Sequence, residues 1–153
     1  MTAESAAAGS PPTGPLEIEI ALRWGDMDIN GHINNVQFAR ILEEGRVRAF
    51  TRWFPGDGGG QPSVVVVRQD IEFRAPLHYS TEPVRLTLAI SRLGATSYTI
   101  GAILESADGV LAAVARTVLV VVDPATGRPM PIPDGVRAIL AAGQADLPGP
   151  RPV

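Results

Sequence analysis

The sequence predicts an α+β fold in which one long helix packs against a single antiparallel sheet. Apolar residues recur at every second position in several separate segments, and at helical spacing in one long segment that follows the first of them. The strand-like segments then succeed one another with short connections, which favours antiparallel pairing and burial of the helix against one sheet. A length of 153 residues is enough for one such domain with a sizeable core.

The first predicted strand begins at Leu16. Apolar side chains alternate from there to Leu22 with residues that are mostly charged, a pattern typical of a strand with one buried face. We expect the strand to end at Trp24, which is followed by a glycine.

The long helix is predicted from a cap near Asn34 to residue 53, and its helical spacing is clear over residues 38–53. Apolar side chains there fall at i, i+3, i+4, i+7, i+11 and i+15, and charged side chains line another face. Asn34 or a neighbour is the expected N-cap, and Pro55 with Gly56 stops the helix. Gly45 lowers helix propensity in the middle of this segment, so it indicates a close approach of a neighbouring backbone or side chain.

Four strands and a short helix follow. The segment from Val64 starts as a continuous β-branched run and then alternates to Phe73, which predicts a central strand buried in part on both faces. The next two strands alternate cleanly, and an Asp-Gly pair before the last strand is a hairpin signal. These elements are expected at residues 84–90, 98–104, 111–122 and, for the terminal helix, 134–142.

Composition excludes several classes of function. The formal net charge is −3, so the chain offers no electrostatic footprint for nucleic acid or for an anionic membrane. The absence of cysteine removes disulfides, thiolate metal sites and cysteine nucleophiles, and two histidines are too few for a multi-histidine metal centre. Any catalysis must therefore use carboxylates, hydroxyls, backbone dipoles or a histidine, and we expect no cofactor.

Both ends of the chain have the composition of tails. Residues 1–15 are rich in Ala, Ser, Gly and Pro and contain no apolar export segment, which predicts a disordered N-terminal tail and a cytoplasmic protein. Residues 143–153 contain three prolines in a polar setting and are expected to form a flexible C-terminal tail. The folded domain is predicted over residues 16–142.

The densest polar segment is DMDINGHINN, residues 26–35, between the first strand and the helix. One interpretation is an EF-hand calcium loop, because carboxylate or amide side chains stand at positions 1, 3 and 5 and a glycine at position 6. Position 12, however, is Gln37, which cannot provide a bidentate carboxylate, and a strand precedes the loop where the motif requires a helix. Calcium is therefore the weaker interpretation.

Two other interpretations of this segment stay open. The first is structural: the acidic and amide side chains cap the helix, and Gly31 supplies an unusual backbone conformation. The second is catalytic: a carboxylate stands just before a helix N-terminus, where the free N–H groups of residues 34–36 form a positive end. That end can bind a developing oxyanion, which is what acyl transfer requires.

Residues 26–35, together with Phe38 and the EEGR segment at 43–46, resemble the signature of hotdog-fold acyl-CoA thioesterases of the 4-hydroxybenzoyl-CoA thioesterase-like branch. Later blocks of the chain resemble the same branch in the same order, so that the resemblance spans most of residues 16–140. The Asp-x-Asp-x-x-Gly-His-x-Asn-Asn block is its specific element. The later blocks lie at residues 71–77, 93–97, 120–123, 127–129 and 131–133.

The resemblance implies a sheet wrapped around the long helix, and a homodimer or homotetramer whose active sites lie at the subunit interface. It places the catalytic carboxylate at Asp28, acting as nucleophile or as general base, and the carbonyl-polarising N–H at Asn35. Asp26 is expected to have a structural role. The substrate is expected to be an acyl-CoA. The substrate-binding candidates are Gly31, His32, Asn34, Phe38, Arg74, Arg92 and Ser97.

Some of these candidates have plain alternatives. Arg74 and Arg92 suit the phosphates of CoA because arginine favours such contacts, but each also fits an ordinary surface charge. Glu43 lies eight residues beyond Asn35, about 12 Å along a helix, so an ion pair or a buried hydrogen bond with Arg46 or another chain is expected of it in place of catalysis. Ser97 resembles a family position near the pantetheine path, although a serine in a strand is commonly a simple sheet residue.

Two rival functions share the fold. A hotdog hydratase has a motif resembling Asp-x-Asn-Pro-x-His, but here Gly31 replaces the proline and His32 comes one residue early. A non-catalytic acyl-CoA-binding module would keep the pocket and lack a usable carboxylate, which the presence of Asp28 argues against. Thioester hydrolysis is the favoured prediction.

Overall fold

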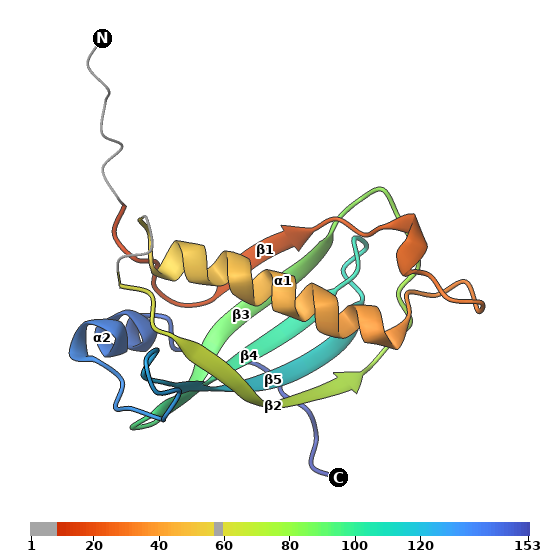
Figure 1. The fold of residues 1–153 in the computed structure, drawn as a ribbon. Coiled ribbons are helices and arrows are strands. Elements are labelled where there is room, and N and C mark those ends of the chain that lie inside the picture. The colour runs from red at the N-terminus through yellow and green to blue at the C-terminus, as the bar shows by residue number, and fades with distance from the viewer. Residues whose placement is uncertain (1–8, 57–59) are drawn as a thin grey trace.

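The computed structural model describes residues 9–56 and 60–153. One five-stranded antiparallel sheet, with strand order β1-β3-β4-β5-β2, curves around the long helix α1, and the short helix α2 closes one end (Figure 1). This is the α+β hotdog architecture that the sequence predicts. The elements are β1 (Leu16–Ile20), the 3-10 turn η1 (Trp24–Asp26), α1 (Asn35–Trp53), β2 (Val64–Phe73), β3 (Val84–Leu93), β4 (Ser97–Glu105), β5 (Leu111–Val121) and α2 (Asp134–Ala142).

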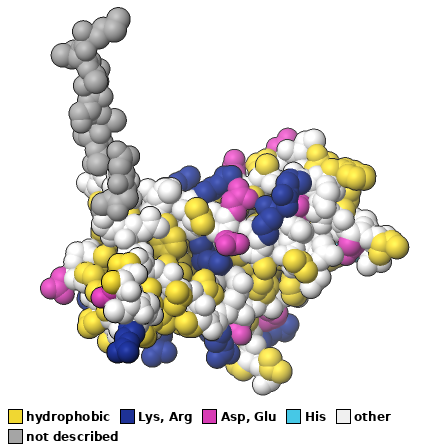
Figure 2. Space-filling view, viewed as in Figure 1, with side chains coloured by type: hydrophobic (Ala, Val, Ile, Leu, Met, Phe, Trp, Pro, Cys, Tyr) yellow, Lys and Arg dark blue, Asp and Glu magenta, His cyan; other side chains and the backbone are white. Residues whose placement is uncertain are grey.

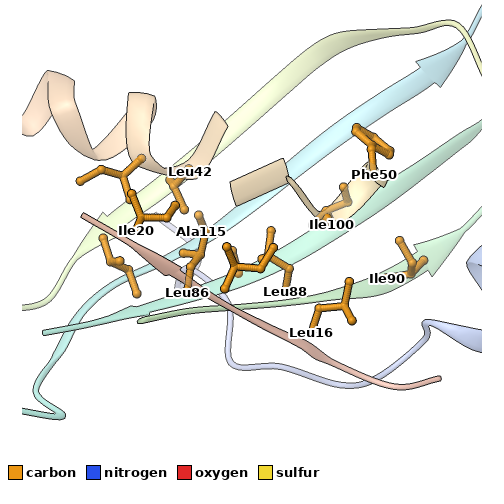
Figure 3. Close-up of a cluster of buried hydrophobic side chains, with 14 of the residues drawn as sticks. Leu16, Ile20, Leu42, Phe50, Leu86, Leu88, Ile90, Ile100 and Ala115 are labelled. Atoms are coloured by element: carbon orange, nitrogen blue, oxygen red, sulfur yellow. The ribbon is translucent and has the colours of Figure 1, made fainter. Parts of the chain in front are cut away.

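Helix α1 begins where the sequence predicts. The side chain of Asn34 accepts a hydrogen bond from the backbone N–H of Val36, so Asn34 is the N-cap. The apolar face of α1 packs into the concave side of the sheet, where Leu42 and Phe50 meet side chains from β1, β3, β4 and β5 (Figure 3). A Cβ atom on Gly45 would overlap the side chain of Leu86, which confirms the close approach expected at this glycine.

Strand β2 differs from its prediction. Among the described strands it pairs with β5 alone and lies at the edge of the sheet, not in its centre. The run of three valines from Val65 to Val67 is exposed, because no further strand of the described residues pairs with β2 and α1 makes few contacts with it. A β-branched run therefore indicated a strand correctly but not its place in the sheet.

The described residues at both ends of the chain contact the folded domain. Residues 1–8 of the predicted N-terminal tail fall outside the described residues; farther on, the N–H of Gly14 donates to the carbonyl of Ala142 at 2.8 Å. Residues 144–153 run behind the sheet, on the face turned away from α1, which we call the outer face (Figure 1). Their flexibility stays a prediction. None of the described helices is long and apolar enough to span a bilayer.

Candidate active site

Hydrogen bonds hold the Asp26 side chain in place within the loop that leads from β1 into α1. Its side chain is 1% exposed and accepts hydrogen bonds from the backbone N–H and Nε of Arg23, both at 2.9 Å, and from Nη2 of Arg40 at 2.7 Å. Burial raises the pKa of this carboxyl, but the hydrogen bonds of Arg23 and the charges of Arg40 and Arg23 outweigh it, so the pKa lies below its ordinary value. Asp26 is thus occupied as a structural ion-pair partner.

This arrangement bears on the calcium interpretation. A calcium loop would need Asp26 as its first ligand, yet both oxygens of that carboxylate accept hydrogen bonds from arginine. The loop also follows β1 and η1 and not a helix, as the sequence indicated. Arg23 and Arg40 therefore bind the carboxylate that an EF-hand would use as its first calcium ligand.

Asp28 sits at the start of a tight turn. Its backbone N–H donates to the carbonyl of His32 at 2.9 Å, and the N–H of Gly31 donates to the carbonyl of Asp28 at 3.0 Å. Gly31 has φ +74°, a left-handed conformation that favours glycine. One carboxylate oxygen of Asp28 accepts the N–H of Asn30 at 2.9 Å. Within the described residues Asp28 forms no ion pair, and its other oxygen accepts no hydrogen bond from the protein.

The turn brings Asp28 to a hollow of 360 Å³ beside the first residues of α1. Phe38 of α1 and Phe73 of β2 form one wall, with ring centroids 5.0 Å apart in an edge-to-face contact. Five of the residues predicted from sequence or resemblance line the hollow, namely Asp28, His32, Asn35, Phe38 and Arg74. The other lining residues are Ile33, Phe73, Ala75 and Pro76.

The start of α1 supplies a positive end to this hollow. The first N–H groups of a helix have no partner within it, and the cap at Asn34 uses the N–H of Val36. The N–H of Asn35 therefore remains available next to Asp28, and both residues line the hollow. A carbonyl oxygen placed here would meet an N–H donor and the positive end of the helix dipole, with a carboxylate beside its carbon.

Two predicted residues lie elsewhere in the chain. Phe73 pairs with Ala113, which pairs with Leu104 near the end of β4, whereas Ser97 begins β4. Ser97 lies seven residues along β4 from Leu104, which is about 23 Å at the usual rise per residue. Arg92 lines a separate hollow of 450 Å³ on the outer face. A single chain therefore does not bring Ser97 or Arg92 to Asp28.

Sequence reasoning missed several contacts of the site. The walls formed by Phe73, Ala75 and Pro76 come from the block at residues 71–77, whose order along the chain was the only available signal. His78 lies against His32 with ring centroids 4.9 Å apart, so the two histidines of the chain meet beside the turn. No local pattern links residues 46 positions apart.

Among the described residues, Arg46 does not form the ion pair or buried hydrogen bond with Glu43 that the sequence led us to expect. Its side chain is buried against the sheet, and Nη1 donates to Oγ1 of Thr117 at 3.4 Å. Burial holds the pKa of this guanidinium below its ordinary value, and the charge of Glu43 offsets part of that shift. No carboxylate within the described residues forms an ion pair with Arg46, so Glu43 acts on it at longer range.

A carboxylate beside a helix N-terminus provides the kinds of group that acyl transfer requires, and the comparisons with known proteins identify the class of protein. A model of the thioesterase-like superfamily matches residues 22–140. The chain belongs to this superfamily and is a thioester hydrolase. No curated protein matches the chain.

Solved structures agree with this assignment. A predicted thioesterase from Bacillus stearothermophilus is 30% identical, covering 88% of this chain and 99% of that chain, with a TM-score of 0.78. A thioesterase from Thermus thermophilus complexed with coenzyme A and Zn is 29% identical, covering 82% and 91%, with a TM-score of 0.71. A putative acyl-CoA thioesterase from Xanthomonas campestris is 31% identical, covering 71% and 93%, with a TM-score of 0.63.

Proposed function

We propose that this protein hydrolyses an acyl-CoA thioester to a free acid and CoA. The observation that carries the proposal is the position of Asp28 beside the N–H of Asn35 at one hollow. Acyl-CoA is the substrate class named for the Xanthomonas relative, and coenzyme A is bound in the Thermus relative. Both likenesses support CoA as the thiol carrier here.

The residues support two routes. In one, the Asp28 carboxylate attacks the thioester carbonyl, CoA leaves as the thiol after taking a proton, and water hydrolyses the resulting mixed anhydride. In the other, Asp28 takes a proton from a water molecule that attacks the carbonyl; the C–S bond then breaks, and CoA leaves as the thiol with that proton. In both, the N–H of Asn35 and the α1 dipole stabilise the oxyanion. Phe38 and Phe73 offer an apolar wall for the acyl group.

We also propose that the active protein is a homodimer or a dimer of such dimers, paired along β2. Within the described sheet this strand is an edge, and its valines 65–67 are exposed. An exposed apolar edge strand is the surface that a second copy can cover by strand pairing. On the side of α1 turned toward the viewer, charged side chains gather among apolar and uncharged ones (Figure 2). The hollow at Asp28 opens to solvent in one chain, so a partner would complete its walls.

A panel of purified acyl-CoA substrates, with detection of the released thiol, tests the proposed activity. We expect turnover with at least one acyl group, retained activity after complete chelation, and loss of turnover in the Asp28→Asn variant. Light scattering at micromolar concentration tests the assembly, and a fully active monomer would contradict it. Activity that is lost on chelation and restored by calcium would return the loop to the calcium interpretation.

A further inference from the structure

The C-terminal segment crosses the outer face of four strands of the sheet, from β3 to β2. We call residues 144–151 the C-terminal strap. The N–H of Ala145 donates to the carbonyl of Ile90 in β3 at 3.1 Å, and the Cβ of Leu147 would meet a Cβ on Gly101 in β4 at 3.7 Å. The strap has contacts on every strand it crosses, so it follows a defined path.

Small residues make room for this path. Ala89 of β3 and Val114 of β5 point to the outer face, yet both are fully buried. Farther along, a Cβ on Gly149 would lie 2.5 Å from Nε of Arg116, so the backbone of the strap rests directly on that guanidinium. The outer face is thus shaped to receive the strap.

The strap ends in a two-sided contact with Glu72 on β2. The backbone N–H of Arg151 donates to Oε2 of Glu72 at 2.7 Å, and its Nε donates to Oε1 at 2.8 Å. A third contact joins Nη2 of Arg151 to the same Oε1 at 2.7 Å. The backbone and side-chain hydrogen bonds from Arg151 hold the pKa of Glu72 below its ordinary value, so Glu72 is ionised at neutral pH.

Glu72 also contacts a residue of the candidate active site. Its Oε1 lies 2.6 Å from Nε of Arg74, and Arg74 lines the hollow that holds Asp28. Arg74 and Glu72 by themselves would cancel, with charges of +1 and −1. When Arg151 joins them, the cluster carries +1 − 1 + 1 = +1. The strap therefore adds one positive charge beside Arg74 at the edge of the hollow.

We propose that the C-terminal strap is part of the substrate-binding surface: it delivers Arg151 to Glu72, and the net positive cluster of Arg74, Glu72 and Arg151 attracts the anionic nucleotide end of a CoA thioester. Arg151 is a positioning residue, since it acts through Glu72 on Arg74. The inference rests on the proposed function, because it assumes a CoA-linked substrate at the Asp28 hollow. CoA is suited to this cluster because its phosphates are strong anionic acceptors for arginine.

The test compares Arg151→Ala with Arg151→Lys, and with Arg68→Ala as a matched control. Arg68 lies on the same strand as Glu72 and its replacement removes the same charge, but it pairs with Asp70 at 2.8 Å and has no contact with Glu72 among the described residues. Each variant is assayed with an acyl-CoA and with the same acyl group on N-acetylcysteamine, a thioester without the nucleotide phosphates. Both are measured at low salt and at 1 M salt.

We expect Arg151→Ala to raise KM for the acyl-CoA about threefold to fivefold at low salt with kcat unchanged, the size of one exposed charge interaction. The effect should vanish at 1 M salt, where screening acts within about 3 Å, and with the N-acetylcysteamine thioester. Arg151→Lys should recover most of the loss because it keeps the charge. An equal rise for Arg68→Ala, or the same rise with N-acetylcysteamine, would overturn the proposal.

Two further measurements separate this proposal from the proposed function. If the wild-type protein hydrolyses no thioester, the proposed function fails, and calorimetric binding of CoA itself tests the strap: Kd should rise about threefold to fivefold in Arg151→Ala at low salt. An unchanged Kd overturns the strap proposal. Hydrogen exchange reports docking directly, since the Arg151 amide should be protected in the full chain and unprotected in Glu72→Ala. A fast-exchanging amide in the wild type would also overturn it.

Discussion

Replacing Asp28 by asparagine removes one charge at the candidate site and little else. An asparagine side chain keeps an oxygen that can accept the N–H of Asn30, so the turn at residues 28–32 should persist. In the described structure Asp28 has no ion pair to lose. What disappears is the group that attacks the thioester or takes the proton from water. We expect kcat to fall by roughly a hundredfold or more, which corresponds to about 2.7 kcal/mol of transition-state stabilisation.

Asp26→Asn is the matched control, since it removes the same charge two residues away. Asp26 is buried among hydrogen bonds from Arg23 and Arg40, so this variant should lose about 2–3 kcal/mol of folding free energy, more than a simple cap would contribute. Its activity should fall less than that of Asp28→Asn and in step with the loss of stability. Initial rates of thiol release and denaturant melts of both variants give the comparison.

The outcome for Asp28→Asn decides the assignment. We expect its oligomeric state to be unchanged and its stability to stay within about 0.5 kcal/mol of the wild type. Near-normal hydrolysis by this variant would refute the reasoning, because no second carboxylate lines the hollow among the described residues. The reaction would then have to use Glu43, brought close by a partner chain. If the wild type binds acyl-CoA without turnover, the non-catalytic module becomes the better description.

Three further predictions concern stability and assembly. Gly45→Ala should lower the free energy of unfolding by about 1–3 kcal/mol despite the better helix propensity of alanine, because its Cβ would overlap Leu86; a more stable variant in denaturant melts would contradict this. Since the folded pKa of Asp26 lies below its ordinary 3.8, its stabilisation is present above about pH 4 and is lost as pH falls through the folded value; Asp26→Asn should therefore show a weaker loss of stability with acid, measured by melts from pH 6 to pH 2. Val66→Lys on the exposed edge should shift light scattering toward the monomer, and an unchanged mass would place the interface elsewhere.

Local sequence patterns were sufficient to predict the strands and helices that bury one face. The alternation after Leu16 and the helical spacing after Phe38 are imposed by burial against the same core. Both elements are present as predicted, although β1 ends at Ile20, before the expected end at Trp24. The Asn34 cap and the terminal helix at Asp134–Ala142 are likewise confirmed. Gly45 was readable for a similar reason, since a glycine inside a helix needs a packing cause.

Local sequence patterns were not sufficient to predict features that depend on contacts between distant parts of the chain. The valines of β2 have the same composition whether a strand lies in the middle of a sheet or at its edge, and only the pairing with β5 alone shows which applies. The C-terminal strap has the polar, proline-rich composition of a tail, yet its backbone finds acceptors on β3 and its last arginine finds Glu72. Its contacts are with residues far away in the sequence, where no periodicity can record them.

The sequence by itself determined the fold class, the long helix and its cap, and the short polar block that contains Asp28 and Asn35. These features depend on side chains within one turn or one strand of each other, so spacing along the chain encodes them. Only the tertiary structure decided which carboxylate of the block is occupied and which is open. Asp26 and Asp28 look alike in sequence, but Arg40 reaches back from α1 to bind Asp26, while Asp28 is left facing the hollow formed with Phe73. The physical reason is that ion pairing and cavity walls are set by distances through space, which the fold creates from residues far apart in the chain.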